Sequence, residues 1–165
     1  AYEVSACLVG SEMCIGDSGY VDDAFPFRYQ GAADLNTYKM FLEVAHHLLR
    51  PGGRLGMLVP SGVYTDQGSA PLRQLFLDDC RWEWLFNFIN HKRVFDIDSR
   101  FKFNVVMLEK GERTETLRVA FNREQLEDLE QPDQFMLDYP RRQVEHFSPR
   151  SLAIVEAQTL SLIHI

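Results

Sequence analysis

The sequence has only three cysteines in 165 residues, and no two of them form a CxxC pair. Without such a pair or neighbouring histidines, the pattern predicts neither a zinc site nor a disulfide framework. We therefore expect no bound metal and a reducing, cytoplasmic setting. No apolar run approaches the roughly 18 residues that a membrane-spanning helix needs, so we also expect no contact with a bilayer.

Basic charge is also scarce. The chain carries 17 Lys and Arg residues against 24 Asp and Glu residues, which gives a net charge of -7. A stand-alone DNA-binding module usually shows a basic surface, so the charge balance weakly disfavours that class. A whole-chain average does not exclude a local basic surface. With 45% hydrophobic residues, the chain is typical of a globular domain with its own core.

The first clear periodic segment is residues 35–49, where apolar residues recur at steps of three and four and predict an amphipathic helix. The stripe consists of Leu35, Tyr38, Leu42, Ala45 and Leu49. The Pro-Gly-Gly turn at 51–53 ends this helix. The continuous apolar run 54–60 predicts a strand covered on both faces.

The pattern continues with a predicted helix over 70–79 and predicted strands over 82–89 and 101–109, separated by the hydrophilic loop 90–100. Helix, strand, helix, strand, strand is the order of an open α/β sheet that ends in an antiparallel hairpin.

Beyond the hairpin, the sequence predicts a strand over 116–121, a short acidic helix over 123–130 and a loop over 133–139. A last helix is predicted over 148–158, with Ser148 as its N-cap and Pro149 at its first position.

Three segments resemble gamma-class adenine-N6 DNA methyltransferases, whose catalytic motif is NPPY. They are DLNTYKMFLEVAHHLLRPGGRLGMLVPSG at 34–62, VFDIDSRFKFNVVMLEKG at 94–111 and FSPRSLAIVE at 147–156. A helix ending in LLRPGG occurs in methyltransferases of every substrate class. NTYKMF at the helix start, combined with a VF loop and then SRFKF, is more specific. The likeness is greatest to large fused restriction-modification and phage-defence enzymes.

This resemblance implies the second half of a Rossmann-like, class I S-adenosylmethionine-dependent methyltransferase sheet. It implies transfer of a methyl group from S-adenosyl-L-methionine to adenine N6 in double-stranded DNA. Residues 19–111 would form part of the methyltransferase domain, and residues 112–159 a linker toward a target-recognition region. Fused nuclease, helicase or recognition domains are the partners implied.

The resemblance gives Phe95 a role in holding the substrate base. Adenine N6 lies within the base stack, so the enzyme must flip the base out, and an aromatic ring can hold it by stacking. Phe95 occupies the place of the family's second stacking aromatic. The alternative is a loop aromatic that packs into the core.

For the cofactor, Phe41 matches the family position that lines the adenine pocket of S-adenosyl-L-methionine. Asn36 and Tyr38 lie at the helix start, near the sheet edge where ligands of open α/β folds bind. The alternatives are a core phenylalanine at Phe41 and an N-cap at Asn36.

Basic residues bracket the Phe95 loop. A base-flipping loop needs phosphate contacts, and we expect them from Lys92, Arg93, Arg100 and Lys102, with solvated loop charge as the alternative. A second basic group, Arg141, Arg142 and Arg150, is a weaker candidate for contact with DNA.

The motifs that would complete such an enzyme are missing from the sequence. No Gly-rich cofactor turn, ribose-binding acid or NPPY motif occurs, so no catalytic residue is present and we expect the chain alone to be inactive. Residues 1–18 and 160–165 resemble translated sequencing-adapter sequence, and we expect them to be non-native. Two other functions stay open: a methyltransferase acting on protein, RNA or a small molecule, and a non-catalytic DNA-binding or assembly subunit.

Overall fold

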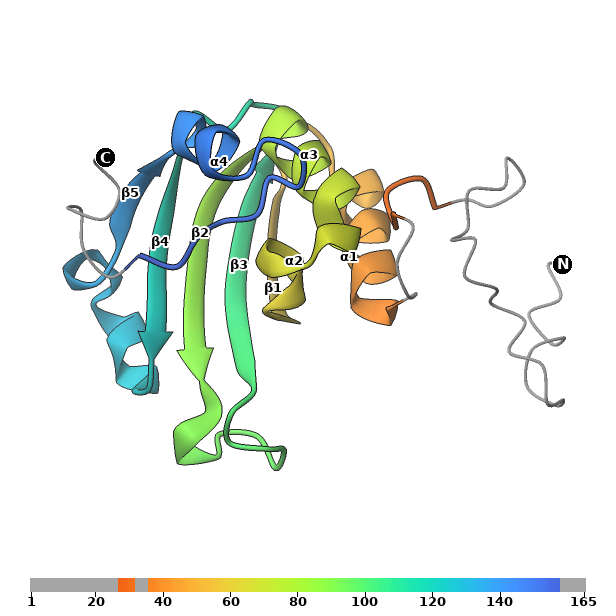
Figure 1. The fold of residues 1–165 in the computed structure, drawn as a ribbon. Coiled ribbons are helices and arrows are strands. Elements are labelled where there is room, and N and C mark those ends of the chain that lie inside the picture. The colour runs from red at the N-terminus through yellow and green to blue at the C-terminus, as the bar shows by residue number, and fades with distance from the viewer. Residues whose placement is uncertain (1–26, 32–35, 158–165) are drawn as a thin grey trace, which may run out of the picture.

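The computed structural model describes residues 27–31 and 36–157 (Figure 1). The leader 1–18 and tail 160–165, expected to be non-native, lie outside these residues. The predicted α/β class is confirmed, because helices pack on an open sheet of order β1-β3-β2-β4-β5. The elements are α1 (Thr37–Leu48), β1 (Arg54–Pro60), α2 (Gly62–Thr65), α3 (Ala70–Asp79), β2 (Cys80–Ile89), β3 (Lys102–Lys110), β4 (Thr116–Arg123), β5 (Leu137–Pro140) and α4 (Arg141–Phe147).

Strand pairing brings three carboxyl ends to one edge of the sheet. β3 pairs antiparallel with both β1 and β2, and β4 runs parallel to β2, so β1, β2 and β4 point the same way. The predicted antiparallel hairpin is therefore β2 and β3, and its loop extends beyond the carboxyl ends of the strands (Figure 1). This is the edge at which open α/β folds bind ligands.

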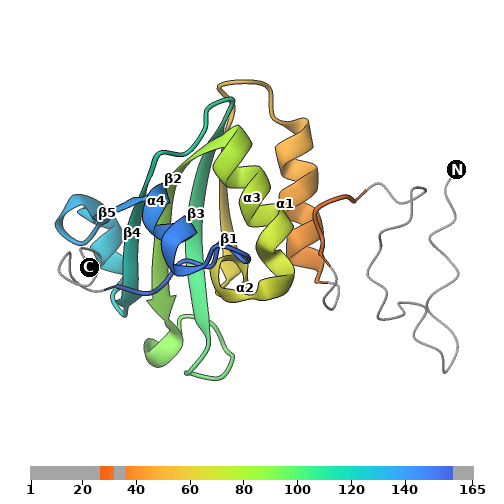
Figure 2. The same ribbon diagram turned by 45° about the horizontal axis from the view of Figure 1, so that its top comes forward.

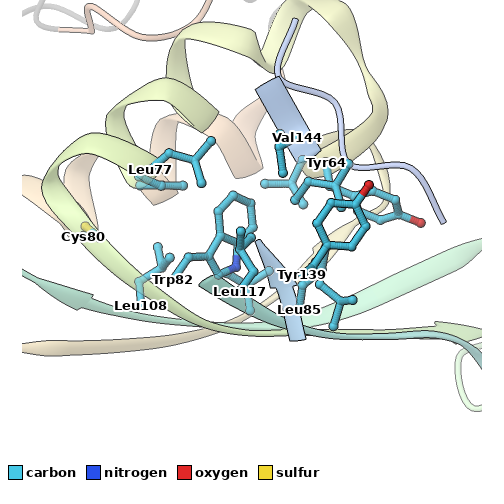
Figure 3. Packing of buried hydrophobic residues seen from close by; sticks show 14 of the residues in the cluster. Tyr64, Leu77, Cys80, Trp82, Leu85, Leu108, Leu117, Tyr139 and Val144 are labelled. Carbon is cyan, nitrogen blue, oxygen red and sulfur yellow. The ribbon is translucent and has the colours of Figure 1, made fainter. Parts of the chain in front are cut away.

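The helices lie on one face of the sheet (Figures 1 and 2). Side chains alternate along β2, so Leu85 joins the core under the helices and Phe86 joins a second cluster on the opposite face. Figure 3 shows Leu77 of α3 and Trp82 of β2 meeting in the helix-covered core. The second cluster is aromatic and consists of Phe86, Phe88, Phe103 and Ala120.

Helix α3 matches its predicted bounds, and α1 begins two residues later than predicted. Asn36 caps α1, because its side-chain oxygen accepts a hydrogen bond from the Tyr38 N–H at 3.4 Å. Of the predicted apolar stripe, Leu42 is fully buried and Tyr38, Ala45 and Leu49 are partly buried, whereas Leu35 lies outside the described residues. The rest of the buried face is polar, however, and was not predicted: Lys39, Glu43 and His46.

Each buried polar side chain of α1 has a partner. The carboxylate of Glu43 accepts hydrogen bonds from the Tyr29 N–H at 3.2 Å and from the Gln30 side chain at 2.5 Å. The Lys39 ammonium donates to the Gln30 carbonyl at 3.1 Å. These bonds offset the cost of burying charge and hold the segment 27–31 against α1.

β1 differs from its prediction. The sequence predicted a strand covered on both faces, but only Val59 is buried, and Leu58 is exposed. Among the described residues, β1 pairs only with β3 and forms one edge of the sheet. A strand at an edge lacks the neighbours that would cover its outer side.

Two predictions beyond the hairpin are wrong. The helix predicted over 148–158 does not form: α4 ends at Phe147, and Ser148 follows it as the C-cap. The loop predicted over 133–139 contains the start of β5, which pairs with β4. The expected domain boundary at residue 111 stays a prediction, although β4 and β5 belong to the same sheet as the strands before it.

Residues 148–157 form an irregular strap across the helical face. Arg73, which is fully buried, donates to the carbonyl oxygens of Ser151 at 2.7 Å, Asp66 at 2.7 Å and Val63 at 2.9 Å. The Ile154 N–H donates to the Tyr64 carbonyl at 3.0 Å. These bonds satisfy backbone groups that a helix would otherwise have paired, so the strap is ordered without regular structure.

Candidate functional site

The loop between β2 and β3 carries the predicted base-stacking residue. A short 3-10 turn over Asn90–Lys92 starts it, and Arg93 follows in the left-handed region with a φ of 50°. The Asn90 N–H donates to the Phe101 carbonyl at 2.9 Å and closes the loop at its base. The loop therefore begins and ends at the carboxyl edge of the sheet.

Phe95 lies on this loop with 39% of its surface exposed. Its ring packs perpendicular to that of Phe103, with centroids 4.9 Å apart. Phe103 stacks on Phe88 at 5.3 Å, and Phe88 on Phe86 at 5.1 Å. Phe95 is thus neither a core residue nor a freely moving one, because it is the exposed end of an aromatic row on the face opposite the helices.

Two of the four predicted phosphate-binding residues have carboxylate partners. Both ends of the Arg100 guanidinium bond to Asp98, at 2.7 and 3.0 Å, and these bonds hold the pKa of Asp98 below its usual value. Lys102 donates to both carboxylate oxygens of Glu156, at 2.7 and 2.8 Å.

The other two predicted phosphate-binding residues, Lys92 and Arg93, lie in different surroundings. Lys92 donates to the uncharged side chain of Gln125, and Arg93 is exposed in the turn of the loop.

Glu156 joins three elements at the same edge, and sequence reasoning missed it. Besides Lys102, it accepts hydrogen bonds from the Tyr64 hydroxyl at 2.7 Å and from the Asn122 amide at 3.2 Å. Burial alone would raise the pKa of Glu156, but these donors outweigh it and lower the pKa. The strap is therefore tied to the base of the Phe95 loop through a charged carboxylate.

The predicted cofactor residues do not form an enclosed site among residues 27–31 and 36–157. Phe41 is 65% exposed, so the alternative of a core phenylalanine is wrong. Tyr38 is half-buried, its hydroxyl lies 3.4 Å from that of Ser69, and burial raises its pKa. The side-chain oxygen of Asn36 is used as the N-cap, as the alternative reading expected.

Phe41 belongs to an exposed apolar surface. Val44 and Leu48 follow it at helical spacing on the outer side of α1, and Leu58 is exposed on β1. Leu58 points to the other face of the sheet, because its neighbours Met57 and Val59 pack in the helix-covered core, so we call Phe41, Val44 and Leu48 alone the α1–β1 apolar surface. It lies beside the sheet edge that β1 forms in the described chain, at the end of the sheet away from β5 (Figure 1).

Arg141 does not fit the second basic patch. It is buried, and its guanidinium donates to the Leu77 carbonyl at 2.6 Å and to the carboxylates of Asp78 and Glu145 at 2.6 and 2.7 Å. Its role is to fasten α4 to the end of α3. No helix within the described ranges is long and apolar enough to cross a membrane.

Residues 17–95 match the family model described as the Eco57I restriction-modification methylase. No curated protein matches the chain. Three solved structures share its fold. A chain from a structure of the complex assembly and conformational transition of the type I R-M system matches with a TM-score of 0.62 and 18% identity, over 81% of this chain and 33% of that one.

The other two are modification proteins. One is a modification subunit assigned to a type I restriction enzyme of Vibrio vulnificus YJ016, with a TM-score of 0.61 and 16% identity over 86% of this chain and 36% of that one. The other is the M protein of the type I restriction enzyme EcoKI, with a TM-score of 0.51 and 21% identity over 64% of this chain and 23% of that one.

The chain therefore spans about a third of the length of the first two structures that it matches. Its open sheet has the same fold as part of these chains. The family model matches residues 17–95, and the likeness to the solved structures shows a shared fold over most of the described chain.

Proposed function

We propose that this chain is the carboxyl half of a methyltransferase domain that transfers a methyl group from S-adenosyl-L-methionine to adenine N6 in double-stranded DNA. It would act in restriction-modification or phage defence. The observation that carries the proposal is Phe95, a half-exposed aromatic ring on an ordered loop at the carboxyl edge of the sheet. The family match and the likeness to modification subunits support it.

The exposed ring suits a flipped base. An enzyme that modifies adenine N6 must remove the base from the duplex and hold it flat, and an aromatic face provides roughly 1–3 kcal/mol of stacking per base. Packing against Phe103 limits the movement of the Phe95 ring before DNA arrives. When the ring is already in position, less of the free energy of stacking is spent on ordering the protein.

The charges around the loop divide into two groups. Asp98 neutralises Arg100, and Glu156 neutralises Lys102, so neither is well placed to give its full charge to a phosphate. Arg93 is exposed in the turn, and Lys92 contacts only an amide oxygen. We therefore assign phosphate contacts first to Lys92 and Arg93, and only secondarily to Arg100 and Lys102.

S-adenosyl-L-methionine, the methyl donor, would contact the described residues only along α1, beside the β1 edge of the sheet. Phe41 could pack against the adenine of the cofactor, because its ring is exposed beside β1. The half-buried Tyr38 would support that wall, whereas the Asn36 oxygen already caps α1. The Gly-rich turn, the ribose-binding acid and NPPY would come from a preceding segment that packs on the α1–β1 apolar surface. The chain by itself would then transfer no methyl group.

The test is methyl transfer by the full-length gene product, measured as tritium incorporation into adenine of duplex DNA. Phe95→Ala should lower kcat/KM by roughly five- to 150-fold, the equivalent of about 1–3 kcal/mol of lost stacking. Phe95→Tyr keeps a ring and should retain most activity. Phe101→Ala is the matched control, since Phe101 is 61% exposed on the same loop but does not continue the aromatic row.

The outcome separates the proposed function from its competitors. Equal activity of wild type and Phe95→Ala would remove the stacking role. If the full-length protein binds DNA but transfers no methyl group, a non-catalytic DNA-binding or assembly subunit is the better description. Methylation of protein, RNA or a small molecule, but not of DNA, would indicate a different substrate class.

A further inference from the structure

The β2–β3 loop has few contacts with the rest of the protein. Every residue from 91 to 98 is exposed, and the ring of Phe95 reaches only the rim of the second aromatic cluster. A loop with so little buried surface is expected to open easily unless hydrogen bonds within it hold its conformation. Arg100 and Asp98 hold one limb of the loop through hydrogen bonds to each other.

Asn90 supplies the hydrogen bonds on the other limb. This side chain is fully buried at the base of the loop. Its Oδ1 accepts a hydrogen bond from the Phe95 N–H at 3.0 Å, and its Nδ2 donates to the Phe95 carbonyl at 2.9 Å and to the Ile97 carbonyl at 3.3 Å. One amide therefore holds both polar groups of the residue that carries the exposed ring.

The backbone of Asn90 also forms hydrogen bonds within the loop. Its N–H donates to the Phe101 carbonyl at 2.9 Å, and its carbonyl accepts from the Arg93 N–H at 2.9 Å. A buried amide is costly without partners, and Asn90 finds all of its partners within the loop. No shorter side chain would reach Phe95, and an aspartate at this position would lose both donors.

We propose that Asn90 is a positioning residue for base stacking: its side-chain amide fixes the Phe95 backbone so that the ring stands ready at the carboxyl edge. The inference rests on the proposed stacking role of Phe95. Asn90 would touch neither the base nor the cofactor, and its whole effect would pass through Phe95. Misplacement of a positioned group by about 1 Å can lower a rate by roughly a hundredfold.

The test uses the full-length gene product, with methyl transfer measured for wild type, Asn90→Ala, Phe95→Ala and the double variant. Asn90→Ala should lower kcat by roughly tenfold or more, with little change in the KM for S-adenosyl-L-methionine. Because both residues act through one ring, the double variant should lose no more activity than Phe95→Ala alone. Hydrogen exchange of the peptide spanning 91–101 should be at least about tenfold faster in Asn90→Ala.

Asn87→Ala is the matched control. Asn87 is equally buried and lies three residues earlier, on β2, but it bonds to Asn104 at 2.8 Å and to the Asn122 N–H at 3.0 Å instead of to the loop. Its replacement should lower stability without speeding exchange in 91–101. If Asn90→Ala does not fold, Asn90→Asp keeps the side-chain volume, removes the donors and takes its place in every comparison.

Two failures are distinguishable. If Phe95→Ala is fully active, the stacking role fails and the positioning role fails with it. If Phe95→Ala is impaired but Asn90→Ala is not, or if the losses of the two single variants add in the double variant, the inference alone is overturned.

Discussion

Helices α1 and α3 lie side by side on the same face of the sheet, but they bury opposite kinds of side chain (Figure 2). α3 places Leu72, Phe76 and Leu77 in the core. α1 buries Lys39, Glu43 and His46 beside Leu42, and it leaves Phe41 and Leu48 exposed. Burial of apolar area therefore holds α3, whereas directional polar contacts hold α1.

The difference between the two helices indicates which apolar surface is covered by other parts of the described chain. α3 contacts the sheet, and Arg73 on it holds the strap 148–157, so the described chain covers its apolar face completely. The α1–β1 apolar surface has no such cover among the described residues. An apolar surface beside an unpaired strand is typical of a docking site for further structure.

The largest difference in stability between the two helices is expected when one apolar side chain is removed from each. Phe76→Ala should lower the free energy of unfolding by about 3–5 kcal/mol, because it empties a site where Phe76 packs edge-on against Trp82 at 6.0 Å. Leu48→Ala should change it by less than about 0.5 kcal/mol, since Leu48 is 81% exposed. Urea unfolding of the 165-residue chain, in which Leu48 is exposed, measures both, and equal losses would contradict the contrast between the helices.

A smaller effect is expected from the buried arginine of α3. Arg73→Leu should cost roughly 3 kcal/mol, because it leaves the carbonyl oxygens of Val63, Asp66 and Ser151 without their donor. Burial lowers the pKa of Arg73 to about 10, so the side chain stays charged at neutral pH. Hydrogen exchange over 148–157 should rise in the variant.

Arg54→Leu is the control for that experiment. Arg54 forms only exposed ion pairs with Glu83 and Glu109, which contribute little to stability. If the strap exchanges no faster in Arg73→Leu than in Arg54→Leu, Arg73 does not hold it.

The smallest expected effect is a pH dependence at α1. Burial lowers the pKa of His46, and Lys110 and, to a smaller extent, His47 add to this, whereas the hydrogen bond that His46 donates to the Asp79 carboxylate at 2.8 Å opposes it. Because His46 in the unfolded chain binds a proton more readily than in the folded protein, stability is lost as the pH falls through the ordinary pKa of histidine, about 6.5. The protection of α1 against hydrogen exchange, corrected for the intrinsic pH dependence of exchange, should fall between about pH 7.5 and about pH 5.5, while that of α3 falls less.

His46→Gln should remove this dependence. The exposed His91, which pairs with Glu124, is the matched control, and His91→Gln should leave the dependence in place. A dependence that survives in His46→Gln would mean that another group loosens α1.

Sequence patterns predicted the elements that are built from local apolar periodicity. The helix over 70–79 and the strands near 54–60, 82–89 and 101–109 were all found close to their expected bounds. The end of the chain was predicted less well. Ser148 and Pro149 look like the start of a helix, but the backbone there is paired with Arg73, which lies more than 70 residues away in the sequence. A long-range partner of this kind leaves no trace in local periodicity.

The candidate site was likewise predicted from the sequence only in part. The resemblance placed Phe95 on an exposed loop, and the structure has it there. It also suggested Arg100 and Lys102 for phosphate, but their pairing with Asp98 and Glu156 became visible only in three dimensions. Asn90 and Glu156 were missed because a single polar residue in a sequence carries no sign of the groups that it will meet.

The sequence by itself determined the class of fold, the order of its main elements and the family resemblance, because these depend on spacing along the chain. Tertiary structure alone decided which strand lies at the edge, which charges are neutralised and which side chain holds Phe95. Those properties depend on contacts between distant residues, such as Lys102 with Glu156 and Arg73 with Ser151, and the free energy of each contact exists only after the chain has brought the two groups together.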